Sequence, residues 1–71
     1  MIYAIFNYLP DENTLVNPAQ CYNPPSFELK TGGKIWCIYC ENVGENTPIE
    51  TFESDIEVSE WLIANTIQVM E

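Results

Sequence analysis

The sequence contains no histidine and no arginine, and its only two basic residues are Lys30 and Lys34. Proteins bind DNA, RNA and anionic membranes through lysine and arginine side chains that neutralise phosphate. Since the chain carries a formal net charge of -9, we do not expect it to bind nucleic acid or a membrane directly. It also lacks a glycine-rich phosphate loop, a nucleophile elbow and the histidine most used for proton transfer. We therefore expect a protein that is not an enzyme.

Long apolar runs are also missing. No stretch approaches the roughly 18 apolar residues that a membrane-spanning helix needs. The segment Met1–Leu9 is apolar but has no basic region and stops at Pro10, so it is not typical of a targeting signal. Cysteine occurs three times, and an odd number would leave one thiol unpaired in a disulfide framework. Reduced cysteines in a cytoplasmic protein are the simpler expectation.

Apolar and aromatic residues are plentiful. Hydrophobic residues make up 46% of the chain, with two Trp, four Tyr and three Phe. This composition is too apolar for a disordered acidic tail. The length of 71 residues fits a single small domain, residues 1–71, near the lower limit for a self-supporting core.

The first half of the chain predicts one central strand, a long loop and a hairpin. Met1–Leu9 is dense in β-branched and aromatic residues, so we expect a strand buried on both faces. Four prolines make 10–26 a long loop. The residues expected to hold this loop to the body are Leu15, Val16, Cys21 and Tyr22. Next, 27–31 and 34–41 read as hairpin strands around a two-residue turn, Gly32-Gly33.

The second half predicts a turn at 42–48, a short strand at 49–53 and one helix at 55–64. Ser54 and Glu57 have the spacing of a capping box, in which Ser54 accepts a hydrogen bond from the Glu57 amide. Asn65 is a residue suited to a left-handed helix stop. A last strand over 66–70 is expected from its alternating β-branched residues.

The helix has two apolar sides in this prediction. Val58, Trp61 and Leu62 share one face and are expected to pack on the sheet. Ile56 and Ile63 fall on roughly the opposite face, which one sheet cannot cover, so a homodimer is an open alternative. The elements together predict an α+β domain, with an antiparallel sheet of four to five strands and one helix packed on one face.

The cysteines form the first candidate site. The run from Trp36 to Cys40 (WCIYC) is similar to the thioredoxin and glutaredoxin motif, but that motif opens a helix. Here Cys37 and Cys40 lie in an expected strand, where positions i and i+3 point to opposite faces. A zinc site with Cys21 would need a carboxylate as fourth ligand, since histidine is absent. We therefore expect buried thiols and neither metal nor cofactor.

Negative charge is the other candidate feature. From Ile35 to Glu71 there are eight carboxylates and no cation. The residues predicted to bind a partner are Glu41, Glu45, Glu50, Glu53, Asp55, Glu57 and Glu60. One interpretation is a solvated surface with helix capping, which explains Asp55 and Glu57. The other is a carboxylate array that imitates nucleic-acid phosphates and meets a basic groove.

In size, acidity and reduced cysteines the chain resembles the small inhibitors of bacteriophages and mobile elements, the anti-CRISPR and anti-restriction proteins. The run from Phe52 to Leu62 (FESDIEVSEWL) is also similar to the strand-to-capped-helix entry of a small α+β anti-CRISPR protein. The resemblance implies a non-enzymatic inhibitor that occupies the basic nucleic-acid-binding site of a host CRISPR effector or restriction enzyme. The host cytoplasm would then be its location.

Two other classes stay open. The chain could be a protein–protein interaction module that acts through Ile56, Ile63 and the loop around Tyr22. It could also be a small redox or metal protein that uses Cys37 and Cys40.

Overall fold

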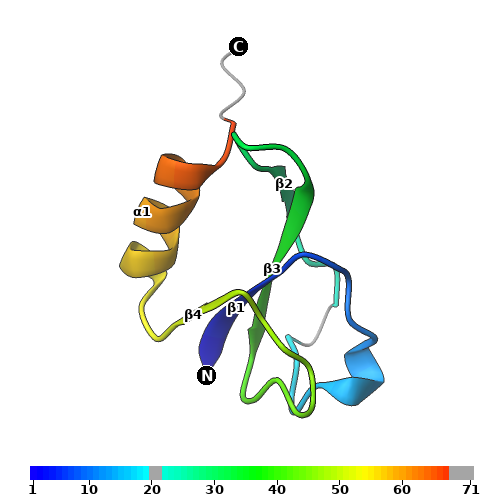
Figure 1. The fold of residues 1–71 in the computed structure, drawn as a ribbon. Helices are drawn as coiled ribbons and strands as arrows, with labels where there is room; N and C mark the ends of the chain where they lie inside the picture. Colours follow the sequence, from blue (N-terminus) through cyan, green and yellow to red (C-terminus); the bar gives the residue numbers. More distant parts are fainter. Residues whose placement is uncertain (20–21, 68–71) are drawn as a thin grey trace.

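Figure 1 shows the computed structural model, which describes residues 1–19 and 22–67. Its sheet has four antiparallel strands in the order β2-β3-β1-β4. The elements in chain order are β1 (Ile2–Phe6), the 3-10 turn η1 (Glu12–Thr14), β2 (Ser26–Glu28), β3 (Lys34–Cys40), β4 (Glu50–Phe52) and α1 (Asp55–Asn65). The predicted α+β class is confirmed. Neither η1 nor α1, the helices of the described residues, has the length and apolar character of a membrane span.

Strand β1 is central, as its composition predicts. It pairs with β3 on one side and β4 on the other, so Tyr3 lies opposite both Tyr39 and Phe52. Ala4, which follows Tyr3 and points to the other face, is fully buried, as are the two residues after it. The strand ends at Phe6, before the exposed residues 7–9. Apolar side chains on both faces of β1 therefore require cover on both sides of the sheet.

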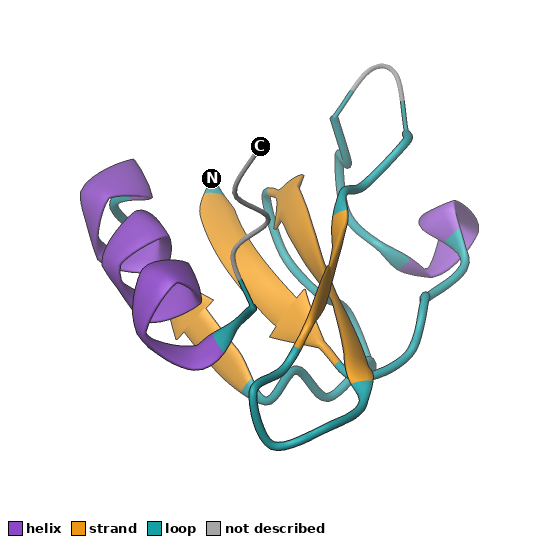
Figure 2. Ribbon diagram, turned by 90° about the horizontal axis from the view of Figure 1, so that it is seen from above, coloured by secondary structure: helices purple, strands orange, loops and turns teal. Residues whose placement is uncertain are grey.

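Two different parts of the chain supply that cover. Helix α1 lies on one face, and the connection between β1 and β2, which includes η1, lies on the other (Figure 2). The buried residues under α1 are Ile5, Ile35 and Val58. The buried residues on the opposite face are Ala4, Phe6, Leu15, Ile38 and Cys40. Trp61 and Leu62 are partly buried against the first cluster, as predicted.

Several of the residues predicted to hold the β1–β2 connection to the sheet do so. Leu15 is buried, and Tyr22 packs on the same cluster while its hydroxyl donates to the carbonyl of Pro10. Val16 also holds the connection, as predicted, although its side chain is 42% exposed. Its backbone makes the contact instead, since the Val16 amide donates to the carbonyl of Asn42 at 2.9 Å. Cys21 lies outside the described residues.

The β2–β3 hairpin is present, but its turn is longer than predicted. The Leu29 amide donates to the Gly33 carbonyl at 2.9 Å, and the Gly32 amide donates back to the Leu29 carbonyl at 3.0 Å. The loop is therefore the three residues 30–32, a type of hairpin that places glycine in the left-handed region after a tight turn. Gly32 has a φ of 95°, which a residue with a Cβ rarely adopts.

Helix α1 starts at the predicted residue with a different cap partner. Ser54 accepts a hydrogen bond from the Ile56 amide at 3.2 Å, rather than from the Glu57 amide. The reciprocal capping box is therefore not the arrangement seen, although Ser54 is the N-cap. Asp55 and Glu57 stay in the first turn, where the helix dipole favours negative charge.

The end of α1 differs more. Asn65 is the last helical residue, and its backbone is not in the left-handed conformation that was predicted. Among the described residues other than glycine, a positive φ occurs at Asn17 and not at Asn65. Thr66 ends the helix with an extended backbone, and its amide and hydroxyl both donate to the Leu62 carbonyl. In its described part the predicted last strand is not formed: Thr66 makes an isolated bridge with Leu29, and Ile67 has no strand structure. Residues 68–70 of that prediction lie outside the described part.

Truncation of Trp61 tests the packing of α1 on the sheet. Its ring lies 6.4 Å from the ring of Phe52, centroid to centroid. We expect Trp61→Ala to lower the free energy of unfolding by roughly 3 kcal/mol, because it leaves a cavity between helix and sheet. Urea unfolding followed by circular dichroism measures it. The control is Ile63→Ala, at a 62% exposed position, with an expected loss below about 0.5 kcal/mol. Equal losses would contradict this packing.

Candidate acidic binding surface

The junction between β4 and α1 brings carboxylates together. The chain leaves the sheet at Phe52 and enters the helix at Asp55. Phe52 and Val58 pack into the core, so the acidic residues between and beside them project outward. Every carboxylate of this segment is exposed to solvent. We call the following set the junction carboxylates: Glu50, Glu53, Asp55, Glu57 and Glu60.

Each junction carboxylate has a defined origin. Glu50 opens β4 opposite Ile5, and Glu53 follows the strand. Asp55 and Glu57 lie in the first turn of α1, and Glu60 follows one turn later. A strand and a helix therefore hold all but Glu53 on regular backbone, which fixes their spacing more firmly than a loop would.

The two remaining predicted residues lie in the β3–β4 connection, next to a different part of the chain. Glu41 accepts a hydrogen bond from the side-chain nitrogen of Asn17 at 3.1 Å. Glu45 follows Gly44, where a Cβ would lie 2.5 Å from the Thr14 carbonyl oxygen. Both are exposed, but the connection is held against residues 14–17. The structure thus separates Glu41 and Glu45 from the residues along α1.

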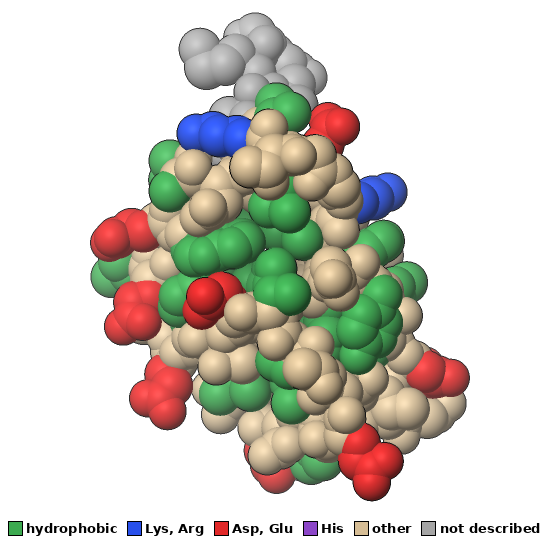
Figure 3. All heavy atoms as spheres, in the orientation of Figure 1, with side chains coloured by type: hydrophobic (Ala, Val, Ile, Leu, Met, Phe, Trp, Pro, Cys, Tyr) green, Lys and Arg blue, Asp and Glu red, His purple; other side chains and the backbone are tan. Residues whose placement is uncertain are grey.

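Figure 3 shows where the acidic and basic side chains gather on one face of the molecule. Carboxylates follow the edge formed by α1, and further ones lie around the loops at the lower right. The two lysines lie toward the upper end. Lys34 is exposed, and its Nζ lies 5.6 Å from the centre of the Trp36 ring. The cations are thus held at the β2–β3 hairpin.

Three exposed carboxylates were not included in the predicted site. Glu28 lies in β2, and Asp11 and Glu12 lie at η1. Asp11 caps this turn by accepting from the Asn13 amide. The signal for Asp11 was available in the sequence, since an Asp before a short polar run is a common N-cap. Negative charge therefore extends beyond the C-terminal half of the chain.

Asp55 also acts on the neighbouring end of the sheet. The Tyr3 and Tyr39 rings lie 4.6 Å apart on the α1 side. Partial burial raises the pKa of the Tyr3 phenol, and the negative charge of Asp55 raises it further. The phenol of Tyr3 is therefore neutral at physiological pH, and it adds no charge to the surface.

The cysteine pair is divided between the two cores. Cys37 lies in the cluster under α1, and Cys40 is buried in the cluster on the other face. This confirms the prediction that a strand points the two thiols to opposite faces. Burial raises the pKa of both thiols, which is the reverse of an activated redox cysteine. No group of three or more metal-ligating side chains occurs within 1–19 and 22–67.

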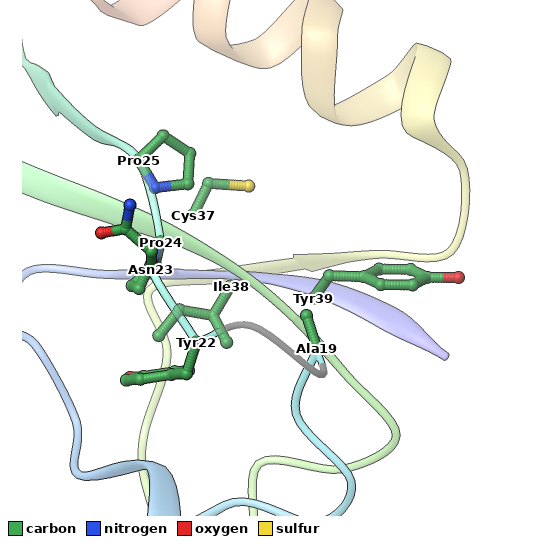
Figure 4. Close-up of a pocket in the computed structure, with 8 residues that line it drawn as sticks. All are labelled: Ala19, Tyr22, Asn23, Pro24, Pro25, Cys37, Ile38 and Tyr39. Carbon is green, nitrogen blue, oxygen red and sulfur yellow. The ribbon is translucent and has the colours of Figure 1, made fainter.

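A cavity of about 120 Å³ lies beside the same strand (Figure 4). Its lining residues are Ala19, Tyr22, Asn23, Pro24, Pro25, Cys37, Ile38 and Tyr39. In Figure 4 the Cys37 and Ile38 side chains point to opposite sides of β3. Among the described residues, the lining consists of apolar side chains, two tyrosines and the Asn23 amide.

Thiol alkylation tests the environment of Cys37. Its raised pKa means that less thiolate is present at pH 7 than in an unstructured peptide. We expect iodoacetamide to label Cys37 more slowly than it labels free cysteine, with a rate that still rises above pH 9.0, the ordinary thiol value. Peptide mapping by mass spectrometry measures the rate at this residue. The urea-unfolded protein is the control; labelling faster than free cysteine at pH 7 would contradict the prediction.

Comparison with known proteins adds no relative: no family model, no curated protein and no solved structure matches the chain. We therefore infer function from the chemistry of the described residues. Exposed carboxylates on regular backbone can form ion pairs and charge-assisted hydrogen bonds with lysine and arginine side chains of a partner.

Proposed function

We propose that this protein is a non-enzymatic inhibitor whose junction carboxylates occupy a basic, nucleic-acid-binding site on a bacterial defence protein. A CRISPR effector or a restriction enzyme is the partner class that the resemblance suggests. The observation that carries the proposal is the exposure of all five junction carboxylates on one strand-to-helix segment. No lysine or arginine follows Lys34 to neutralise them.

The spacing along α1 supports phosphate mimicry. With a rise of about 1.5 Å per residue, Glu57 and Glu60, which are three residues apart and neighbours on the helix surface, are separated by about 4.5 Å along the helix axis. Phosphates on one strand of DNA follow each other at about 3.4 Å along its axis. A row of lysine or arginine side chains that binds a nucleic-acid backbone would therefore meet carboxylates at a comparable pitch.

Helix capping alone does not account for this surface. The helix dipole favours Asp55 and Glu57, which lie in the first turn. Glu50, Glu53 and Glu60 lie outside that turn and gain little from the dipole. Their like charges repel each other in the free protein, and a cationic partner would relieve that repulsion.

An interaction module with an apolar contact is the second candidate. It is supported by the exposed fractions of Ile56 and Ile63, 66% and 62%. The redox or metal alternative has less support, because the two thiols lie on opposite faces with raised pKa values.

A competition assay tests the proposed function. A purified type II CRISPR effector and a restriction endonuclease are each incubated with the protein, and cleavage of their DNA substrate is measured. We expect inhibition of one of them, and a loss of at least about tenfold in inhibitory potency for Glu57→Gln/Glu60→Gln, a change of about 1.4 kcal/mol.

The matched control is Glu12→Gln/Glu28→Gln, which removes the same charge from exposed positions in η1 and β2. Its potency should stay within about twofold of the original protein, because the loss of net charge alone has a small effect on docking. Equal weakening by both pairs would show that net charge and not the junction surface is responsible. A lack of inhibition of any nucleic-acid-binding defence enzyme would contradict the proposed function.

A further inference from the structure

The outer side of α1 combines apolar and acidic side chains. Ile56 and Ile63 are seven positions apart, so they lie on the same side of the helix, two turns from each other. Glu60 lies between them, four positions after Ile56 and three before Ile63, and Glu57 lies one turn before Glu60 at the flank of this side. We call these four residues the outer face of α1. Part of the apolar contact and part of the acidic contact that the sequence predicts as rivals therefore lie together on α1.

The described chain leaves this face open. The helix uses Val58, Trp61 and Leu62 for the sheet, and these residues lie on the opposite side from Ile56 and Ile63. The two isoleucines are the most exposed large hydrophobic residues of the described chain. Two isoleucines aligned on one exposed helix face are typical of an interaction site rather than of scattered surface residues.

We propose that the outer face of α1 docks into an apolar groove whose rim carries lysine or arginine. Ile56 and Ile63 enter the groove, and Glu57 and Glu60 pair with the basic rim. This inference rests on the proposed function and adds the shape and chemistry of the partner site. It is the helix-in-groove mode of recognition, in which residues about two turns apart serve as anchors.

Charge complementarity favours a partner with a basic rim. Each apolar anchor has a carboxylate within one turn of the helix, so a partner that covers the isoleucines must also approach negative charge. A second copy of the chain would bring α1 against α1 in a two-fold contact, and the carboxylates of both copies would then face each other. Both lysines lie at the β2–β3 hairpin, where the Lys30 amide donates to the carbonyl of Asn65 at the C-terminal end of α1 and the Lys34 Nζ lies over the Trp36 ring. Nucleic acid and anionic lipid share the sign of this face and would be repelled.

The geometry also sets the spacing of the partner's pockets. Seven residues of helix place the Ile56 and Ile63 anchors about 10.5 Å apart along the axis. A groove with two apolar pockets at that distance and cations on its rim would satisfy all four side chains. A flat basic surface would leave the isoleucines in water.

Two labelled peptides test the inference with the intact protein. One is an amphipathic helical peptide of leucine and lysine, with a leucine stripe flanked by lysines. The other is an oligolysine of the same charge without leucine. Fluorescence anisotropy measures the affinity of each. We expect Ile56→Ser/Ile63→Ser to weaken binding of the leucine–lysine peptide at least about tenfold and oligolysine binding by less than about twofold.

Leu9→Ser is the control, because Leu9 is 51% exposed and lies outside α1; its affinity for both peptides should not change. Amide chemical shifts recorded with the leucine–lysine peptide should move along the outer face of α1. Urea unfolding should show that the variants are folded, since both isoleucines are exposed.

The failures of the two proposals differ. If Glu57→Gln/Glu60→Gln weakens both peptides while Ile56→Ser/Ile63→Ser changes neither, the groove inference is wrong and the acidic docking surface stands. If the isoleucine changes abolish binding and the glutamate changes have no effect, the contact is purely apolar and the proposed function fails. Self-association of the protein that Ile56→Ser/Ile63→Ser abolishes would show a second copy on this face and overturn the inference.

Discussion

The burial of β1 on both faces is the constraint from which the rest of the structure follows. A four-stranded sheet in a chain of 71 residues has two apolar faces to cover, and the chain has one long helix within its described residues. Helix α1 therefore covers one face, and the proline-rich connection covers the other (Figure 2). Because the helix is committed to the sheet through Val58 and its neighbours, its outer face is available for a partner.

The same constraint places the carboxylates at the surface. Apolar side chains and Thr66 fill the interior of the described protein, so its carboxylates must lie at the surface. The segment that crosses from β4 to α1 alternates between core residues and acidic residues, and the acidic residues are exposed. The opposite rim of the sheet, at the β2–β3 hairpin, carries the two lysines. The molecule therefore has an acidic side with apolar anchors, which suits a cationic groove.

Local sequence patterns predicted the strands and the helix. The details that these patterns did not predict depend on backbone angles and on contacts between distant parts of the chain. The apolar density of β1 and the spacing of Val58 and Trp61 were sufficient for the central strand and for the helix, which ends one residue beyond the predicted range. The cap partner of Ser54 and the hairpin loop depend on backbone angles that composition does not encode. The exposure of the acidic site residues could be predicted because charged side chains rarely lie in the interior. The separation of Glu41 from α1 could not be predicted, because it results from a contact with Asn17 in a loop distant in the sequence.

The ionic-strength dependence of a purified complex tests the central claim most directly. For a partner identified through its inhibition, the dissociation constant is measured from about 0.05 to 0.5 M salt, a range over which exposed charges become strongly screened. The account predicts that log Kd rises steadily with log salt concentration, with a smaller slope when Glu57 and Glu60 are replaced by glutamine. An affinity that is independent of salt across this range would contradict it.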